Sequence, residues 1–422
     1  MNLKPKLKIL LLFLLVYALF SFISLNRHSK SKIYTYHSEL WADKAGYNVY
    51  LPSLFIYDFD ASKFTDSLDY KVGNGFTLDA SSKKIITKYP YGVSLLQSPF
   101  WLIAHSLSEI KDGYSMPYQK AIDFAGCFYL TLGLFFLFFI FNKLYSVWQS
   151  ILFSLLILFS SGIFYYGIFE TGMSHIYSFC TLSVLLYLLL HNNNFKPNRY
   201  ILLLSVLSLI YLIIRPINVL FLVPIFGYFL YQNQESYFNR TTILTISKQQ
   251  IILIISASVI FVLPQLMYYN YAFGSFFVKS YQNEPFETPT LIRITELLFS
   301  PNNGLLIYYP VCLVMIIYSF WTNHKFKFLL LSVFIIYILI YASWWSLSLG
   351  CGFGHRAMND IILVFFAPLF LLSVKPKKWF ILTILCLAIV NFKFIFSYDS
   401  CLYTSVNWDF TEYTSILFGE FK

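Results

Sequence analysis

The first long polar segment of the chain contains, near its start, Tyr36-His37-Ser38-Glu39-Leu40-Trp41-Ala42-Asp43-Lys44-Ala45-Gly46-Tyr47. This segment runs from about residue 27 to residue 119 and directly follows the first hydrophobic run. Two carboxylates, Glu39 and Asp43, lie four residues apart and are flanked by aromatic residues. Most of the remaining sequence is apolar, so the pattern predicts a large polar loop attached to a bundle of hydrophobic helices. Any chemistry is expected first in this loop.

The composition indicates an integral membrane protein. Only 12% of the 422 residues are charged and 58% are hydrophobic, whereas a soluble domain has about 25% charged residues. The 46 Phe and 34 Tyr suit a helical bundle with aromatic belts at the membrane interfaces. The formal charge of +10 does not indicate nucleic acid as a partner, because many Lys and Arg lie in short loops between apolar runs. Membrane lipids are the expected surroundings.

The six cysteines are scattered along the chain, and no two of them form a CxxC pair. The sequence therefore carries no zinc or redox signature. Cys351 and Cys401 are candidates to face an oxidising compartment, but the sequence does not show whether they form a disulfide.

The apolar runs predict an all-α fold with about eleven transmembrane helices, since each span needs about 20 apolar residues, with a range of roughly 17–25. Proline in Ile214-Arg215-Pro216 separates the fifth and sixth runs into a hairpin. The first run is expected to be an uncleaved anchor, with a signal peptide as the alternative. The predicted spans are 7–25, 120–141, 148–168, 172–191, 200–214, 216–232, 250–271, 304–322, 328–345, 358–374 and 378–397.

The basic residues predict the orientation, because cytoplasmic loops are enriched in Lys and Arg. With a cytoplasmic N-terminus, every cytoplasmic segment carries at least one base, and few bases remain in the short loops of the other face. The apolar run 93–110 would reverse this order if it crossed the membrane, so it is expected in the interface plane or packed on the bundle. Residues 1–397 then form the transmembrane domain, with 27–119 as an extracytoplasmic loop and 398–422 as a short extracytoplasmic tail.

With this topology, the unusual polar residues collect on the extracytoplasmic face. An ionisable group at membrane depth costs about 2.5–3.5 kcal/mol on insertion scales, so it usually has a partner or a function. The cytoplasmic loops carry bases and little else. The convergence therefore predicts a site on the outer face, with candidate residues Glu39, Asp43, Glu170, His175, Arg215, Glu284, Asn303, His355 and Arg356.

Each candidate taken alone also has an explanation without function. Glu39 and Asp43 can be solvated loop acids, and Glu170 and His175 can be surface residues of a tight loop. Arg215 can extend to lipid headgroups. The segment from Gly350 to Gly354 can be a flexible turn without any further role. It is the occurrence of all of them on one face that favours a site.

The residue types suggest transfer of a group from a lipid phosphate. A carboxylate can act as general base on a hydroxyl, which typically contributes about 10²–10⁴-fold. Arginine binds phosphate through paired N–H groups, and a glycine-rich turn lets the backbone approach a ligand closely. Asp43, Glu170 and His175 are also possible ligands of a divalent cation such as Mg²⁺ or Mn²⁺, but their spacing does not decide this.

Several sequence strings resemble the GT-C superfamily of integral membrane glycosyltransferases, which includes protein O-mannosyltransferases and lipid A aminoarabinose transferases. The closest resemblance is to uncharacterised bacterial members of Bacteroidetes type, and it covers most of the chain up to about residue 375. The shared plan is one span, a large outer loop with an acidic motif and in-plane helices, and then many spans. The strings are Asp43-Lys44-Ala45-Gly46-Tyr47, Tyr50-Leu51-Pro52, Lys88-Tyr89-Pro90-Tyr91-Gly92, Glu170 with Met173-Ser174-His175, Ile214-Arg215-Pro216, Ser300-Pro301-Asn302-Asn303-Gly304 and Gly352-Phe353-Gly354-His355-Arg356.

The resemblance implies an inverting transfer of a sugar from a polyprenyl-phosphate donor to a hydroxyl of a glycan, lipid or protein acceptor, in a bacterial inner membrane. Asp43 would be the general base, with Glu39 and Glu170 as further catalytic acids. The lipid phosphate and substrate would be held by His175, Arg215, Glu284, Asn303, His355 and Arg356. Many members carry an acid-x-acid pair in the first loop, whereas Glu39 and Asp43 are four residues apart, which leaves the use of a metal open.

Two other classes fit parts of the pattern. Polysaccharide polymerases or ligases of the O-antigen type also have many spans, but their large outer loop usually lies late in the chain. Transporters place charges at the membrane midplane and often contain inverted repeats, whereas this sequence shows charges on one face and no repeat. A non-catalytic scaffold also remains open, and it predicts that Asp43→Asn changes no glycan.

Overall fold

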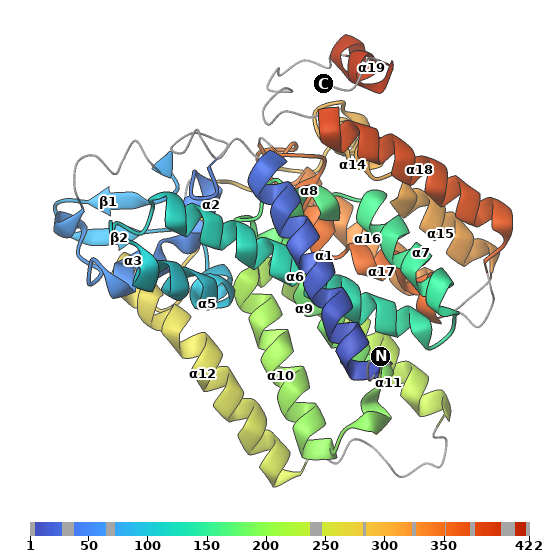
Figure 1. Cartoon of the computed structure of the whole chain (residues 1–422), viewed down its shortest axis with the longest axis horizontal. Helices are drawn as coiled ribbons and strands as arrows, with labels where there is room; N and C mark the ends of the chain where they lie inside the picture. Colours follow the sequence, from blue (N-terminus) through green and yellow to red (C-terminus); the bar gives the residue numbers. More distant parts are fainter. Residues whose placement is uncertain are drawn as a thin grey trace.

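The computed structural model describes residues 5–27, 38–64, 72–236, 247–281, 284–322, 326–350, 352–371, 376–397 and 410–418. The described chain is mostly helical (Figure 1). Cys351 and Cys401 lie outside the described residues. The elements are α1 (Pro5–Arg27), α2 (Asp43–Asn48), α3 (Tyr50–Phe55), η1 (Ala61–Lys63), β1 (Thr77–Asp79), β2 (Lys84–Ile86), α5 (Gly92–Leu107), α6 (Met116–Asn142), α7 (Val147–Phe159), α8 (Ile163–Ile168), α9 (Ser174–Leu190), η2 (Asn192–Asn194), α10 (Pro197–Ile214), η3 (Pro216–Asn218), α11 (Val219–Ser236), α12 (Lys248–Phe273), α13 (Leu291–Phe299), α14 (Leu305–Tyr308), α15 (Val311–Trp321), α16 (Phe326–Ala342), η4 (Arg356–Asp360), α17 (Ile362–Leu371), α18 (Lys378–Ser397) and α19 (Phe410–Phe418).

Five helices among the described residues are long and apolar enough to cross a membrane: α1, α6, α10, α12 and α18. This is what an all-α membrane protein requires. The helices α7, α9, α11, α15, α16 and α17 are apolar but shorter. Among the described residues, these are eleven apolar helices, of which five have the length of a full span, so the number of eleven spans stays a prediction.

Three of the predicted spans are interrupted. The run 148–168 divides at Ser160–Gly162 into α7 and α8, where Gly162 packs so closely that a Cβ atom would lie 2.4 Å from the Tyr309 hydroxyl. The run 304–322 restarts after Pro310, which cannot continue the short helix α14. The run 358–374 begins with the 3₁₀ helix η4 instead of an α-helix.

The first polar loop is a folded cap with its own core, which we define as residues 38–64 and 72–118. Its buried side chains include Leu40, Trp101 and Tyr114. Strands β1 and β2 pair antiparallel within it, so the all-α prediction misses one small hairpin. Helix α5 packs on α6, α10 and α2, and it is not among the candidate spans. Whether α5 lies in the plane of a membrane interface stays a prediction.

Helix α12 joins the cap to the bundle at the outer edge of the molecule (Figure 1). The Tyr268 hydroxyl accepts a hydrogen bond of 2.7 Å from the backbone N–H of Thr87. The Tyr271 hydroxyl accepts one of 2.9 Å from the N–H of Ile85. Helix α10 packs along α12, and the cap therefore rests on the ends of both helices.

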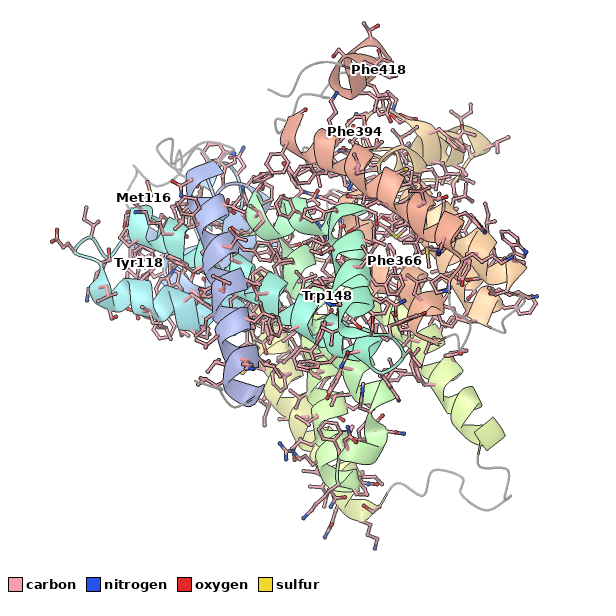
Figure 2. The ribbon with its side chains drawn as sticks, turned by 45° about the vertical axis from the view of Figure 1, so that its right-hand side comes forward. Met116, Tyr118, Trp148, Phe366, Phe394 and Phe418 are labelled. Atoms are coloured by element: carbon pink, nitrogen blue, oxygen red, sulfur yellow. The ribbon has the colours of Figure 1, made fainter. Side chains whose placement is uncertain are left out.

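The main core lies between the helices of the bundle and is rich in aromatic side chains. Figure 2 shows Phe366 on α17 within this bundle and Tyr118 at the start of α6, beside the cap. Tyr118 stacks obliquely on Trp101 with ring centroids 5.1 Å apart. The start of α6 is thereby held to α5, which places the cap over one end of the bundle.

Candidate functional site

The carboxylate of Asp43 joins three distant parts of the chain. It is the first residue of α2, and its Oδ2 accepts a hydrogen bond of 2.7 Å from Arg356, 313 residues away. Its Oδ1 accepts a hydrogen bond of 2.5 Å from the hydroxyl of Tyr89. The Asp43 side chain remains 29% exposed and that of Arg356 20% exposed. A ligand can therefore reach both members of this ion pair.

Close packing at Gly46 places Tyr89 against Asp43. A Cβ atom at Gly46 would lie 2.3 Å from the carbonyl oxygen of Gly75 and 2.5 Å from the Tyr89 ring. Real Cβ atoms do not approach other atoms so closely, so only glycine lets α2 lie directly on these two segments. The spacing of Asp43 and Gly46 in the sequence thus has a structural reason.

We expect Gly46→Ala to lower the free energy of unfolding by about 1–3 kcal/mol, because the added methyl group overpacks this contact. Thermal unfolding of the purified protein in detergent measures the effect. Gly227→Ala is the matched control, since a Cβ atom there meets nothing within 4 Å and alanine is the better helix former. Equal losses in both variants would contradict the close packing at Gly46.

A second charged group surrounds Asp360, at the other end of η4. Its Oδ2 accepts a hydrogen bond of 2.7 Å from Arg215, and its Oδ1 lies 3.1 Å from Nδ1 of His175. The Asp360 side chain is 2% exposed, and its backbone carbonyl accepts a hydrogen bond from Tyr211. Since η4 carries both Arg356 and Asp360, one short helix connects the two charged groups.

Tyrosine hydroxyls hold the segment before η4 in place. The carbonyl oxygen of Phe353 accepts hydrogen bonds of 3.0 Å from Tyr166 and 2.9 Å from Tyr309. The side-chain amide of Asn303 donates to the carbonyls of Ser348 and Gly350. Asn303 therefore stabilises the loop before η4, and the structure shows it in a supporting position.

His355 points away from the neighbouring Arg356. It is fully buried, and its Nδ1 lies within hydrogen-bond distance of the Tyr337 hydroxyl. Burial, together with the charge of Arg356, lowers the pKa of His355 to about 3, so the imidazole is neutral at physiological pH. The imidazole therefore brings no positive charge to the site, and the phosphate-binding role of His355 stays a prediction.

Glu39 and Glu170 anchor the cap to the loop between α8 and α9. The Glu39 carboxylate is fully buried and accepts a hydrogen bond of 2.8 Å from the N–H of Gly172. Glu170 forms a buried ion pair of 2.7 Å with Lys44, the residue after Asp43. The sequence places both acids among the catalytic candidates, but their burial favours a role in positioning α2.

Lys88 and Glu284 form a third accessible pair beside Tyr89. The Lys88 ammonium lies 5.3 Å from the centroid of the Tyr89 ring and 5.2 Å from that of Tyr281. The Lys88 charge also acts on Asp43. Glu284 is thus close to the site, as expected, but its contact is with a cation.

The site keeps Asp43 ionised. Burial alone would raise the pKa of this carboxyl, but Arg356, the Tyr89 hydroxyl and Lys88 outweigh it and hold the pKa below its usual value. The Asp43 carboxylate is therefore negative at physiological pH.

The possible metal ligands do not gather. Asp43 contacts Arg356, Glu170 contacts Lys44, and His175 contacts Asp360. Within the described ranges, no group of three His, Cys, Asp or Glu side chains is placed to hold a metal ion. These residues do not fit a shared Mg²⁺ or Mn²⁺ site, and no step below is derived through a metal.

The structure brings Asp43 and Arg356 together, and it brings His175 together with Arg215. Sequence reasoning assigned no role to four partners of these residues: Lys44, Lys88, Tyr89 and Asp360. Lys88 and Tyr89 lie in one of the strings of the family resemblance, and Asp360 is an ionisable residue at the start of an apolar run. Those signals were available, but no rule for a single sequence assigns the partner of each residue.

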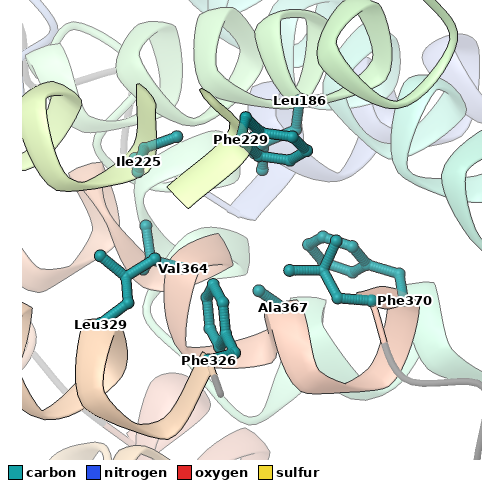
Figure 3. Close-up of a pocket in the computed structure, with 9 residues that line it drawn as sticks. Leu186, Ile225, Phe229, Phe326, Leu329, Val364, Ala367 and Phe370 are labelled. Carbon is teal, nitrogen blue, oxygen red and sulfur yellow. The ribbon is translucent and has the colours of Figure 1, made fainter. Parts of the chain in front are cut away.

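An apolar cavity lies elsewhere in the bundle, between α9, α11, α16 and α17 (Figure 3). Its lining contains only hydrophobic side chains: Leu186, Ile225, Phe229, Phe326, Leu329, Val364, Ala367, Phe370 and Leu371. None of the charged residues described above lines it. The cavity is therefore not part of the candidate site.

The fold and the site together define a mostly helical protein with helices long and apolar enough to cross a membrane and with a charged centre beside a folded cap. Comparison of the chain with protein-family models, curated proteins and solved structures finds no match.

Proposed function

We propose that the protein is an inverting membrane glycosyltransferase that transfers a sugar from a polyprenyl-phosphate donor to an acceptor hydroxyl. The observation that carries the proposal is the contact between Asp43 and Arg356. It places an accessible carboxylate and an accessible guanidinium, the two groups that such a transfer needs, within 2.7 Å of each other. Arg215 is a second, partly exposed guanidinium. It contacts Asp360, which lies on the same helix η4 as Arg356.

The proposed reaction uses Asp43 as general base. The acceptor oxygen forms a bond to the anomeric carbon of the donor while the bond from that carbon to the phosphate oxygen breaks, which inverts the anomeric centre. The hydroxyl proton passes to the Asp43 carboxylate, and the bonding electrons leave with the phosphate. Arg356 and Arg215 stabilise the developing negative charge, because guanidinium groups donate paired hydrogen bonds to phosphate oxygens.

The proposed topology has eleven spans, a cytoplasmic N-terminus and the site on the extracytoplasmic face of a bacterial inner membrane. The contacts support one shared face for the site. Arg215 follows α10 and Glu170 precedes α9, whereas η4 precedes α17. In an eleven-span order these three positions all lie on the side of the cap. The sugar, the acceptor and the linkage are left to experiment.

The test is transfer of radiolabelled sugar in purified membranes, with a panel of polyprenyl-phosphate sugars and with and without a chelator. Label that moves from a donor to an acceptor supports the proposal. If no donor is consumed, the glycosyltransferase proposal fails, and the O-antigen-type polymerase and the transporter become the next functions to test.

The pH dependence of this transfer tests the role of Tyr89. Asp43 acts as base only when ionised, so activity is lost as the pH falls through its lowered pKa. Tyr89→Phe removes a hydrogen bond to a charged group, worth about 1.5–3 kcal/mol, and 1.36 kcal/mol corresponds to one pKa unit. We expect the acidic limb of the pH–rate profile to move upward by about 1–2 units.

Tyr91→Phe is the control for this measurement, because the Tyr91 hydroxyl donates to the carbonyl of Phe261 instead of to Asp43. Its acidic limb should stay at the wild-type position. An unchanged limb in Tyr89→Phe would show that the hydrogen bond does not set the acidity of the base.

A further inference from the structure

Three accessible cations surround the site, and each one is already paired with a carboxylate. Arg215 contacts Asp360, Arg356 contacts Asp43, and Lys88 contacts Glu284. When a phosphate enters the site, both guanidinium groups, those of Arg215 and Arg356, therefore already have a carboxylate partner. Binding must add a ligand to a pair or replace its carboxylate.

The two arginine pairs differ in how firmly their carboxylates are held. Each carboxylate has a second partner besides its arginine, His175 for Asp360 and Tyr89 for Asp43. They differ in exposure, since Asp360 is 2% exposed whereas Asp43 is 29% exposed. Solvent can replace the arginine at Asp43 but not at the buried Asp360, so the carboxylate of Asp43 can lose its arginine at lower cost.

The same pair also weakens Asp43 as a base for the proposed reaction. Arg356 donates to Oδ2 and Tyr89 to Oδ1, so each carboxylate oxygen already accepts one hydrogen bond, and, against the opposing effect of burial, the charge of Arg356 lowers the pKa of Asp43. A general base must have an oxygen within about 2.6–3.2 Å of the hydroxyl that it deprotonates. Release of Arg356 from Asp43 would free a carboxylate oxygen for the acceptor hydroxyl and, in the same step, a guanidinium for the phosphate.

We propose that Arg356 is an exchangeable anion site: the phosphate of the donor takes this guanidinium from Asp43 and thereby frees the carboxylate for the acceptor. The inference rests on the proposed function for the class of its ligand, a lipid phosphate ester, but the exchange itself needs no turnover. Arg215 stays on Asp360 and supplies the fixed second contact. The donor then binds before Asp43 can act, and the resting enzyme holds its base engaged with Arg356.

Binding of farnesyl phosphate and of inorganic phosphate to the purified full-length protein tests the exchange, because neither probe carries a sugar to transfer. Asp43→Asn removes the charge that competes for Arg356. We expect it to bind both probes about tenfold more tightly than wild type, the size expected from losing one charge-assisted hydrogen bond. The ratio of the affinities for farnesyl phosphate and inorganic phosphate should be the same in every variant, because the lipid chain does not contact the exchanged pair. This ratio separates the contribution of the lipid chain from that of the phosphate.

Asp58→Asn is the matched control, since it removes one negative charge from the exposed Lys63 pair of the same cap. It should change binding by less than about threefold, because the charge of an exposed pair is screened by salt. The double variant Asp43→Asn with Arg356→Gln should lose the gain. Equal affinities of wild type and Asp43→Asn, or equal gains in Asp43→Asn and Asp58→Asn, would overturn the exchange. Size-exclusion profiles and thermal unfolding establish that each variant is folded.

The two proposals fail separately. Tighter phosphate binding in Asp43→Asn without transfer by wild type would support the exchange and reject the glycosyltransferase. Transfer by wild type with unchanged phosphate binding in Asp43→Asn would support the enzyme and reject the exchange.

Discussion

Asp43→Asn is expected to reduce sugar transfer by about 10²- to 10⁴-fold, the usual contribution of a general base. Asparagine has the size of aspartate but cannot accept the hydroxyl proton. The loss should appear in the turnover rate for every donor that wild type uses, because the base acts on the acceptor and does not contact the sugar in the proposed reaction. Transfer of label in purified membranes measures it.

Asp58→Asn is the control in the same cap. Asp58 is exposed and pairs only with the exposed Lys63 among the contacts of its side chain described here. Its φ angle of 50° suits asparagine as well as aspartate. This variant should transfer at the wild-type rate. Activity at the wild-type level in Asp43→Asn would exclude Asp43 as the base. If a chelator abolished the activity of the wild-type protein, the metal would need ligands other than Asp43, Glu170 and His175 together.

Asp360→Asn is expected to have the largest effect on stability. The substitution removes the negative charge between Arg215 and His175 in a buried position. Breaking a buried ion pair by removal of one partner costs about 3–5 kcal/mol, because the remaining charge stays desolvated. The partial exposure of Arg215 favours the lower end of that range. The unfolding midpoint in detergent or nanodiscs should therefore fall clearly below that of wild type.

The exposed pair of Asp58 and Lys63 again provides the comparison, since exposed ion pairs contribute about 0–1 kcal/mol. Adding Arg215→Gln to Asp360→Asn should recover part of the loss, because the unpaired charge is then gone. A wild-type unfolding midpoint in Asp360→Asn would contradict the anchoring role of this residue. The contrast between a fixed and an exchangeable arginine would then lose its basis.

The positions of the helices could be predicted because a spanning helix leaves a long apolar run, as in α6 and α12. The interruptions were harder to predict. Pro310 marks one of them, but the break at Gly162 depends on Tyr309, which is distant in the sequence. The hairpin of β1 and β2 has only three residues per strand, too few for a clear alternation of polar and apolar residues.

The candidate site shows a similar division. Ionisable residues between apolar runs could be found because such residues are costly near a membrane and therefore rare, as with Arg215. Their roles depend on direction and partners, which one sequence does not contain. His355 and Arg356 are adjacent in the sequence, yet the first is buried against Tyr337 and the second reaches Asp43. His355 precedes η4 with φ −74° and ψ 82°, outside the helical region, so its side chain does not follow the helical order that begins at Arg356.

The hydrogen bonds between α12 and the cap have a consequence for biosynthesis. The cap lies early in the chain, whereas Tyr268 and Tyr271, which accept the N–H groups of Thr87 and Ile85, come more than 180 residues later. A ribosome therefore releases the whole cap long before the helix that completes its hydrogen bonds is made. Until α12 has entered the membrane and reached α10, the strand that leads to Lys88 and Tyr89 lacks two of its acceptors. The charged centre is thus completed only late in translation, because Arg356, the partner of Asp43, comes later still.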